Sequence, residues 1–237
     1  MRVSYNEIYT NVKKACIAVG VPIGVAEDIA RSVTNGMESG MDYLEQITVA
    51  LDKIYDTRSA TYDPDQALRG LFISSNPDKS LSALNSAPSA CDLTVLEPKE
   101  EYSFHQTEFI KLSQVDVPSL VIFEALRMSR DLQKDECIWW EIDNINQCEG
   151  VCLRGKLMML QCSYKVILEC QNRSMTMKKM EKKKLGEGFK EHVGTLDNEN
   201  ISRKNWDKIT SYSNMLLVRT SEESRMKGAG AGVVDRD

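Results

Sequence analysis

Apolar residues recur at helical spacing through the first sixty residues of the chain. Ser4 and Glu7 have the spacing of a capping box, and the apolar positions that follow them lie three or four residues apart. A second apolar stripe follows Pro22, and a third follows Asp42. Because the intervening loops are short, we expect the helices to pack closely. The predicted helices cover residues 4–19, 22–39 and 42–54.

The pattern changes between residues 61 and 111, where prolines interrupt a stretch rich in Ser, Asn and Asp. This composition disfavours long helices. Residues 91–96 resemble a strand, for which residues 104–112 are a candidate partner. A helix is predicted next, over residues 119–130, where apolar residues recur in successive turns.

The remaining chain is rich in β-branched and aromatic residues up to about residue 178. A helix is then predicted over residues 205–218. Strands that follow helices favour an α+β fold, with an N-terminal helical unit followed by a mainly antiparallel or mixed sheet and a few helices. We expect one domain over residues 1–237, with a helical subdomain at 1–58 and an α+β body at 59–237. The predicted strands are 138–142, 151–153, 158–162, 165–170 and 174–178.

Composition is typical of a globular protein with a sizeable core, since 42% of the 237 residues are hydrophobic and 27% are charged. The start of the chain has no apolar stretch of signal-peptide length, and no apolar run is long enough to cross a bilayer. The sequence therefore predicts a soluble, cytoplasmic protein that does not enter a membrane.

Seven cysteines, an odd number, are scattered along the chain. Without an export signal they are expected to be reduced and buried. Cys148 and Cys152 lie four apart, but neither His105 nor His192 is near them in sequence, so no zinc site is predicted. The sequence identifies no cofactor.

Charge is segregated, because residues 151–190 carry a net charge of +7 in a chain whose net charge is −5. The densest part is the run from Lys178 to Lys184, which could contact a phosphate backbone. No aromatic residues alternate with these lysines as a stacking platform requires. A solvated lysine-rich loop is the favoured interpretation, and a nucleic acid partner is disfavoured.

The C-terminal segment is the strongest candidate for a ligand site. Alternating glycines allow close backbone approach, and backbone N–H groups beside an arginine can hold a carboxylate or phosphate. A dinucleotide fingerprint is excluded because no helix can follow the last glycine before the given sequence ends. The candidate residues are Ser221, Glu223, Ser224, Arg225, Gly228, Gly230, Gly232, Asp235 and Asp237.

Other interpretations of the same residues stay open. Arg225 can instead pair with Asp235, Asp237 or the terminal carboxylate and hold the tail against the domain. These acids could also attract Mg²⁺, but exposed terminal acids are common, and no metal site is predicted. His105 could act as a general base if it faced the motif. Trp139 and Trp140 should point to opposite faces of a strand.

Two resemblances follow from these residues. The opening Val3-Ser4-x-Asn6-Glu7-Ile8, the stretch at 20–27 and the ending from Ser221 to Asp237 resemble a bacterial family known only as a domain of unknown function. The resemblance implies a soluble bacterial protein. The opening is also similar to the N-terminal helices of the non-Rossmann malate/lactate dehydrogenases, but this chain has no histidine near Gly40-Met41-Asp42-Tyr43, so it lacks that family's proton-transfer residue.

Two functions are weighed. The first is binding, or acting on, a small anionic metabolite at the C-terminal motif, with Arg225 clamping the anion. The alternative is a non-catalytic interaction or assembly module, in which the motif is a structural closure and the N-terminal helices offer a partner surface, as in a homo-oligomer. A deep pocket lined by Arg225 would favour the first, and an exposed apolar stripe on helices 4–19 or 22–39 the second. Whether the protein is an enzyme is not decided by its sequence.

Overall fold

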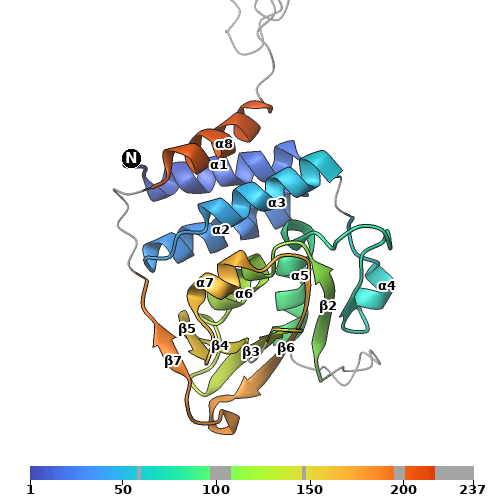
Figure 1. Ribbon diagram of the computed structural model, residues 1–237, viewed down its shortest axis with the longest axis vertical. Coiled ribbons are helices and arrows are strands. Elements are labelled where there is room, and N and C mark those ends of the chain that lie inside the picture. Colours follow the sequence, from blue (N-terminus) through green and yellow to red (C-terminus); the bar gives the residue numbers. More distant parts are fainter. Residues whose placement is uncertain (58–59, 97–107, 146–147, 195–200, 217–237) are drawn as a thin grey trace, which may run out of the picture.

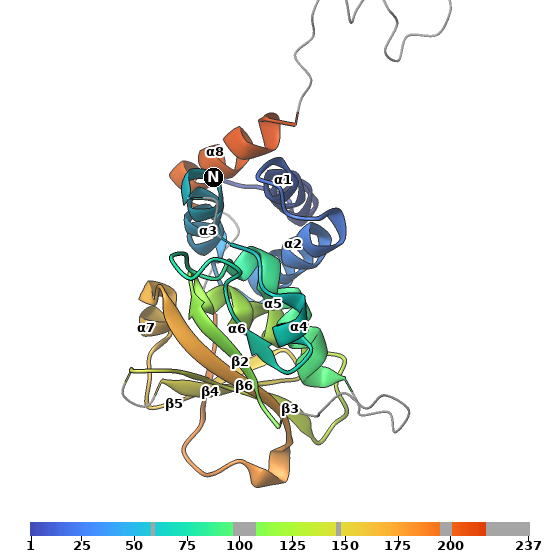
Figure 2. The same ribbon diagram turned by 90° about the vertical axis from the view of Figure 1, so that its right-hand side faces the viewer.

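The protein is built in three layers: N-terminal helices, a central layer of helices, and a sheet (Figures 1 and 2). The computed structural model describes residues 1–57, 60–96, 108–145, 148–194 and 201–216. The helices are α1 (Tyr5–Ala18), α2 (Ile23–Glu38), α3 (Leu44–Thr57), α4 (Pro64–Ala67), α5 (Ala83–Val95), α6 (Pro118–Met128), α7 (Tyr164–Glu169), the 3-10 turn η1 (Lys182–Lys184) and α8 (Arg203–Asn214). The strands are β1 (Leu71–Phe72), β2 (Ile110–Val115), β3 (Glu136–Ile142), β4 (Glu149–Leu153), β5 (Lys156–Leu160), β6 (Arg173–Glu181) and β7 (Lys190–His192).

The first layer contains the three predicted N-terminal helices and α8. The capping box is present, since the Glu7 amide donates to Ser4 Oγ (3.2 Å) and the Ser4 amide donates to Glu7 Oε2 (2.9 Å). α8 packs on α1 and α3, and the Tyr212 hydroxyl donates to Asp52 Oδ1 on α3 (2.7 Å). α8, which lies close to the end of the described chain, therefore completes the layer formed by α1, α2 and α3.

The central helix is α6, which packs against α2 and α5 on one side and against β3 and β4 on the other. Its residues 118–126 are all buried. A helix that is apolar on all sides belongs in a protein interior, and α6 joins the helical layer to the sheet. The helix predicted over residues 119–130 is confirmed, ending at Met128.

The described strands form one sheet in the order β1-β2-β6-β3-β4-β5-β7. Only the β1–β2 pair is parallel. The β4–β5 hairpin turns at Arg154 and Gly155, whose φ angles are 52° and 76°, as a two-residue turn with two positive φ angles requires. Helices followed by a mostly antiparallel sheet confirm the α+β prediction.

The sheet has two apolar faces of unequal size. Trp140 is fully buried against the main core, whereas Trp139 is half-buried beside a smaller cluster around Cys137 and Val151. The two tryptophans lie on opposite faces, as predicted. Gly150 lies so close to Trp140 that an added Cβ would sit 2.3 Å from the indole ring.

Two predicted strands are wrong. Residues 91–96 mostly belong to α5, which is 13 residues long and contains Pro88, so the expectation of no long helix between 61 and 111 also fails. Small residues let α5 pack closely on α6, and this packing outweighs the low helix propensity of Pro88 and of the Asn and Ser residues around it. The second wrong strand, residues 165–170, is mostly α7, whose start is capped by Ser163 Oγ accepting from the Val166 amide (3.4 Å).

The boundary at residue 58 remains a prediction. One apolar cluster includes Ile8 and Ile47 from the first layer together with Phe123 and Trp140. This shared core is consistent with one domain over the described chain.

Candidate functional site

The residues predicted to bind a ligand lie outside the described part of the chain. All nine candidates from Ser221 to Asp237 fall within residues 217–237, and His105 falls within 97–107. The structure therefore does not test whether these residues come together. The candidate site described below is made by other residues.

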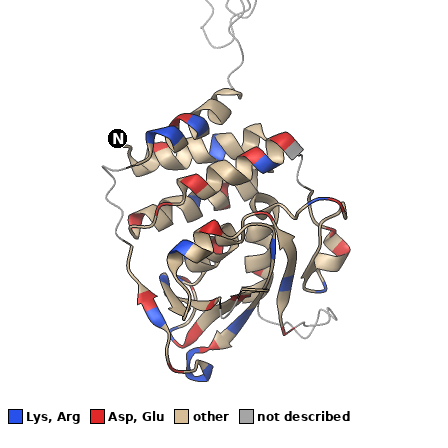
Figure 3. Cartoon of the chain, in the orientation of Figure 1, with Lys and Arg blue, Asp and Glu red and all other residues tan. Residues whose placement is uncertain are grey.

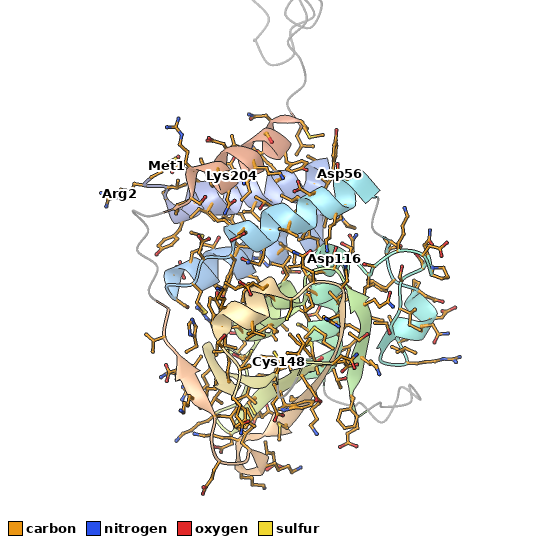
Figure 4. All side chains as sticks on the ribbon, in the orientation of Figure 1. Met1, Arg2, Asp56, Asp116, Cys148 and Lys204 are labelled. Atoms are coloured by element: carbon orange, nitrogen blue, oxygen red, sulfur yellow. The ribbon has the colours of Figure 1, made fainter. Side chains whose placement is uncertain are left out.

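Asp116 lies at the end of β2, where the chain enters α6, at the level of the central helices (Figure 4). Its side chain is fully buried. Asp116 Oδ1 accepts from the amides of Ala83 (2.8 Å) and Val117 (2.7 Å), which lie at the starts of α5 and α6. Its second oxygen, Oδ2, has no hydrogen-bond partner among the described residues. Asp116 thus caps the starts of α5 and α6 with Oδ1, and its Oδ2 is an unpaired acceptor among the described residues.

Lys53 of α3 and Asn172 of the α7–β6 connection meet beside Asp116. Lys53 Nζ donates to the Asp116 carbonyl oxygen (3.1 Å) and to Asn172 Oδ1 (3.2 Å). The Asn172 amide donates to the same carbonyl (3.2 Å), and Ser80 Oγ donates to Asn172 Oδ1 (2.8 Å). Asn172 has a φ of 53°, a conformation that asparagine tolerates better than most residues. The Lys53–Asn172 contact joins residues 119 apart in the sequence.

Burial changes the protonation of this cluster. It raises the pKa of Asp116 to about 6, against the opposing effects of the Ala83 and Val117 amides and the Lys53 charge. Burial also lowers the pKa of Lys53, against the attraction of Asp116. Both charged forms are therefore less favourable here than in water.

A cavity of about 360 Å³ adjoins this cluster, between α3, α7 and the start of α6. Val117 and Gln171, which line it, are the chain neighbours of Asp116 and Asn172. Gln46 of α3 also lines it; the residue is 5% exposed, and its Oε1 has no hydrogen-bond partner among the described residues. Buried polar atoms are almost always paired, so an unpaired oxygen on a residue of the cavity wall calls for an explanation. The remaining lining residues are Glu45, Val49, Lys165, Leu168 and Glu169.

The cavity has the properties of a small-molecule site with an excess of acceptors. Its volume is at the lower end of the range typical of ligand pockets. Val49, Val117 and Leu168 supply apolar surface. Lys165 lies 3.7 Å from Glu169, which leaves Glu45 as an unbalanced charge on the lining. A ligand with N–H donors and a short apolar body is complementary to these groups.

A second buried carboxylate, Glu124 of α6, has a different environment. Its Oε1 accepts from Arg127 Nε (3.0 Å) and Nη2, and its Oε2 accepts from Ser32 of α2. Burial raises its pKa, against the hydrogen bonds from Arg127 and Ser32. Arg127 also lies 3.9 Å from Asp28. Because both oxygens of Glu124 are paired within the protein, this cluster joins α2 to α6 and offers a ligand no free acceptor.

The prediction that the lysine run forms a loop is wrong. Lys178 and Lys179 lie in β6, and Lys182 to Lys184 form η1, at the end of the molecule away from the N-terminal helices (Figure 3). Lys178 Nζ lies 4.7 Å from the centre of the Phe109 ring and 5.3 Å from that of Trp139. Several neighbouring lysines are paired with acids: Lys179 with Glu136, and Lys183 and Lys184 with Glu181. The paired charges reduce what the run can offer a phosphate backbone.

Within the described part of the chain, no helix is long and apolar enough to cross a membrane. In the same part of the chain, no group of three or more His, Cys, Asp or Glu residues is arranged to hold a metal ion.

Comparison with known proteins relates the first part of the chain to a protein family. Residues 3–76 match a family described as "Protein of unknown function (DUF3726)". The matched range covers α1 to β1 and contains Gln46 and Lys53, but not Asp116 or the C-terminal motif. It supports the resemblance of the opening to an uncharacterised family, whereas the C-terminal signature stays a prediction. No curated protein and no solved structure matches the chain.

Proposed function

We propose that the protein binds a small molecule bearing N–H donors, such as an amine or a primary amide, in the cavity between α3 and α7. The observation that carries this proposal is the Gln46 side chain, which is buried and lines the cavity with an unpaired Oε1. A bound N–H group would supply the missing partner and remove the cost of burying an unpaired oxygen, which is about 1–3 kcal/mol.

The cluster around Asp116 positions one wall of this cavity. Lys53 and Asn172 hold the Asp116 carbonyl, so Val117 and Gln171 are fixed at positions next to paired backbone groups. A site built on such restrained positions loses little conformational entropy when it binds. Asp116 and Lys53 are therefore assigned a positioning role.

The proposal is tested by thermal-shift screening of the whole protein with small primary amines, primary amides and, as a comparison class, carboxylates. Amines or amides are expected to raise the melting temperature in proportion to their concentration. The Gln46→Leu variant should lose that shift, and it should itself melt no lower than the wild type because it lacks the unpaired oxygen. A screen in which only carboxylates stabilise the protein would overturn the proposal.

The C-terminal motif carries a separate proposal that rests on the sequence alone. Arg225, with Ser221 and Ser224 beside alternating glycines, would bind a small anionic metabolite. If so, carboxylates or phosphates should stabilise the wild type but not a folded Arg225→Ala variant. If Arg225→Ala instead melts far lower and no anion shifts the wild type, the motif is a structural closure.

The alternative of an interaction or assembly module gains no support from the N-terminal helices. The buried apolar residues of α1 and α2 pack between these two helices and against α3, α5, α6 and α8, although Ile23 at the start of α2 is exposed. Homo-oligomer formation, bacterial origin and a cytoplasmic location stay predictions.

A further inference from the structure

Cys148 and Cys162 meet at the open end of the β4–β5 hairpin. The strands are in register with Glu149 opposite Leu160, so Cys148 comes just before the ladder and Cys162 two residues after it. The Cys162 amide donates to the Leu160 carbonyl (2.8 Å), which closes a three-residue turn at Gln161, with a φ of 55°. This turn directs Cys162 back toward β4, where its thiol donates to the Glu149 carbonyl oxygen (Sγ to O 3.8 Å).

The register of the hairpin and the turn at Gln161 bring the two thiols close together, and each thiol shifts the pKa of the other. A positive φ is uncommon for glutamine and costs conformational energy, so the turn that creates this contact is maintained against strain. Cys148 lies at the level of the sheet (Figure 4).

Accessibility differs between the cysteines. All seven are described and are free thiols, and Cys162 alone is not buried. Cys148 is fully buried next to it, and the nearby Cys170 donates its thiol to the Val166 carbonyl oxygen (2.9 Å). A small reagent can therefore reach Cys162 first, and Cys148 is the adjacent thiol that can respond.

The contact also divides the roles of the two sulfurs. The hydrogen bond from Cys148 lowers the pKa of Cys162, against the effect of burial. The same hydrogen bond, with burial, raises the pKa of Cys148. The accessible sulfur therefore has the greater thiolate character, which is the property of a reactive cysteine.

We propose that Cys148 and Cys162 are a redox-active pair, which a hydroperoxide oxidises reversibly to a disulfide. The Cys162 thiolate attacks one oxygen of the hydroperoxide; an S–O bond forms, the O–O bond breaks, and the leaving oxygen takes a proton to become an alcohol or water. Cys148 then loses its proton and attacks the sulfenic acid; the S–S bond forms, the S–O bond breaks, and water leaves. Two thiols and one hydroperoxide thus give one disulfide, one alcohol or water, and one further water.

This reaction does not depend on the proposed ligand site, since no cysteine lines the cavity between α3 and α7. Failure of either proposal would leave the other standing.

The test treats the whole protein with hydrogen peroxide, alkylates the remaining thiols and identifies the products by mass spectrometry. We expect a disulfide-linked pair of peptides containing Cys148 and Cys162, five alkylated cysteines, and recovery of all seven thiols after dithiothreitol. Full alkylation of Cys162 after peroxide treatment, or its linkage to Cys170 instead, would overturn the proposal.

Two variants sharpen the result. In Cys148→Ala, a sulfenic acid should accumulate on Cys162 and be trapped by dimedone, because its resolving thiol is absent. The matched control, Cys170→Ala, should form the disulfide at the wild-type rate. If Cys170→Ala forms no disulfide, the resolving thiol is Cys170 and not Cys148, and the proposal is wrong. If Cys148→Ala fails to fold by circular dichroism, the wild-type peptide map decides the question.

Discussion

Two carboxylates, Asp116 and Glu124, are fully buried and differ in how their oxygens are paired. Glu124 has partners on both oxygens, including an arginine, whereas Asp116 has partners on Oδ1 alone among the described residues. An unpaired buried acceptor is expensive, so each such group calls for an explanation. Of the six buried side-chain polar atoms without a hydrogen-bond partner among the described residues, Gln46 Oε1 belongs to the one residue that lines the cavity.

The raised pKa of Asp116 predicts a pH-dependent stability. Its value is about 6 in the folded protein and near 3.8 when unfolded, so folding favours the protonated form. The contribution is fully present below about pH 4 and is lost as the pH rises through about 6, a change of about 3 kcal/mol. Urea unfolding of the wild type and Asp116→Asn should show the wild type gaining stability, relative to the variant, as the pH falls from 8 to 4.

The comparison with Asp116→Asn is needed because folding also shifts the pKa values of other carboxylates. Burial also raises the pKa of Asp92, and the pKa of Glu27 is lowered by its hydrogen bond from Lys13. These groups affect both proteins equally. A stability difference that does not change with pH would show that Asp116 is not the group responsible.

Two glycines provide a matched test of packing. A Cβ at Gly150 would lie 2.3 Å from the Trp140 ring and 2.6 Å from the Met158 carbonyl oxygen, so Gly150→Ala should destabilise the protein by about 1–3 kcal/mol. Gly24 on α2 has open space around its Cβ position, and Gly24→Ala should be neutral or stabilising by up to about 1 kcal/mol. Chemical denaturation measures both, and equal effects would contradict the close approach of Trp140 to β4.

The candidate cavity site could not be predicted from the sequence. Lys53, Asp116 and Asn172 come from three distant segments, and Gln46 sits within an ordinary amphipathic helix. Neither their types nor their spacing marks them, because their role depends on which segments the fold brings together. Cys148 and Cys162 are fourteen residues apart and become a pair only through the hairpin and the turn at Gln161.

At the scale of elements, α6 is the helix on which the layers depend. Its Glu124–Arg127 ion pair contacts α2 through a hydrogen bond from Ser32 to Glu124 and through Asp28, which lies 3.9 Å from Arg127. Arg127→Met would leave Glu124 buried without its charged partner and should cost about 3–5 kcal/mol. The double variant Arg127→Met with Glu124→Leu removes both charges and should be more stable than the single variant. Denaturation curves measure the difference. A double variant less stable than Arg127→Met would show that the loss does not come from leaving Glu124 buried without its charged partner.

Element prediction succeeded where local signals agree with the fold. α1 combines a capping box with a regular apolar stripe, and both are observed. It failed at α5 and α7, where local composition opposes the outcome. Pro88 and small polar residues in α5 disfavour a helix in isolation, and Val166, Ile167 and Leu168 in α7 favour a strand, but packing on α6 selects helices in both places.

At the scale of the whole molecule, the proposed cavity lies where the first helical layer meets the helix that connects β5 to β6. α3 supplies Gln46 from one side, and α7 supplies Leu168 from the other. The three-layer arrangement thus creates a cavity that neither the N-terminal helices nor the sheet could form alone. The family match over residues 3–76 covers only the α3 side of it.

The most direct test of the account is calorimetric titration of the amine or amide that gives the largest thermal shift. The wild type, Gln46→Leu and a control, Gln66→Leu on α4 away from the cavity, are compared. We predict that Gln46→Leu weakens the affinity at least tenfold, about 1.4 kcal/mol, and that Gln66→Leu leaves it unchanged. Equal affinities in the wild type and Gln46→Leu would contradict the claim that the cavity between α3 and α7 is the binding site.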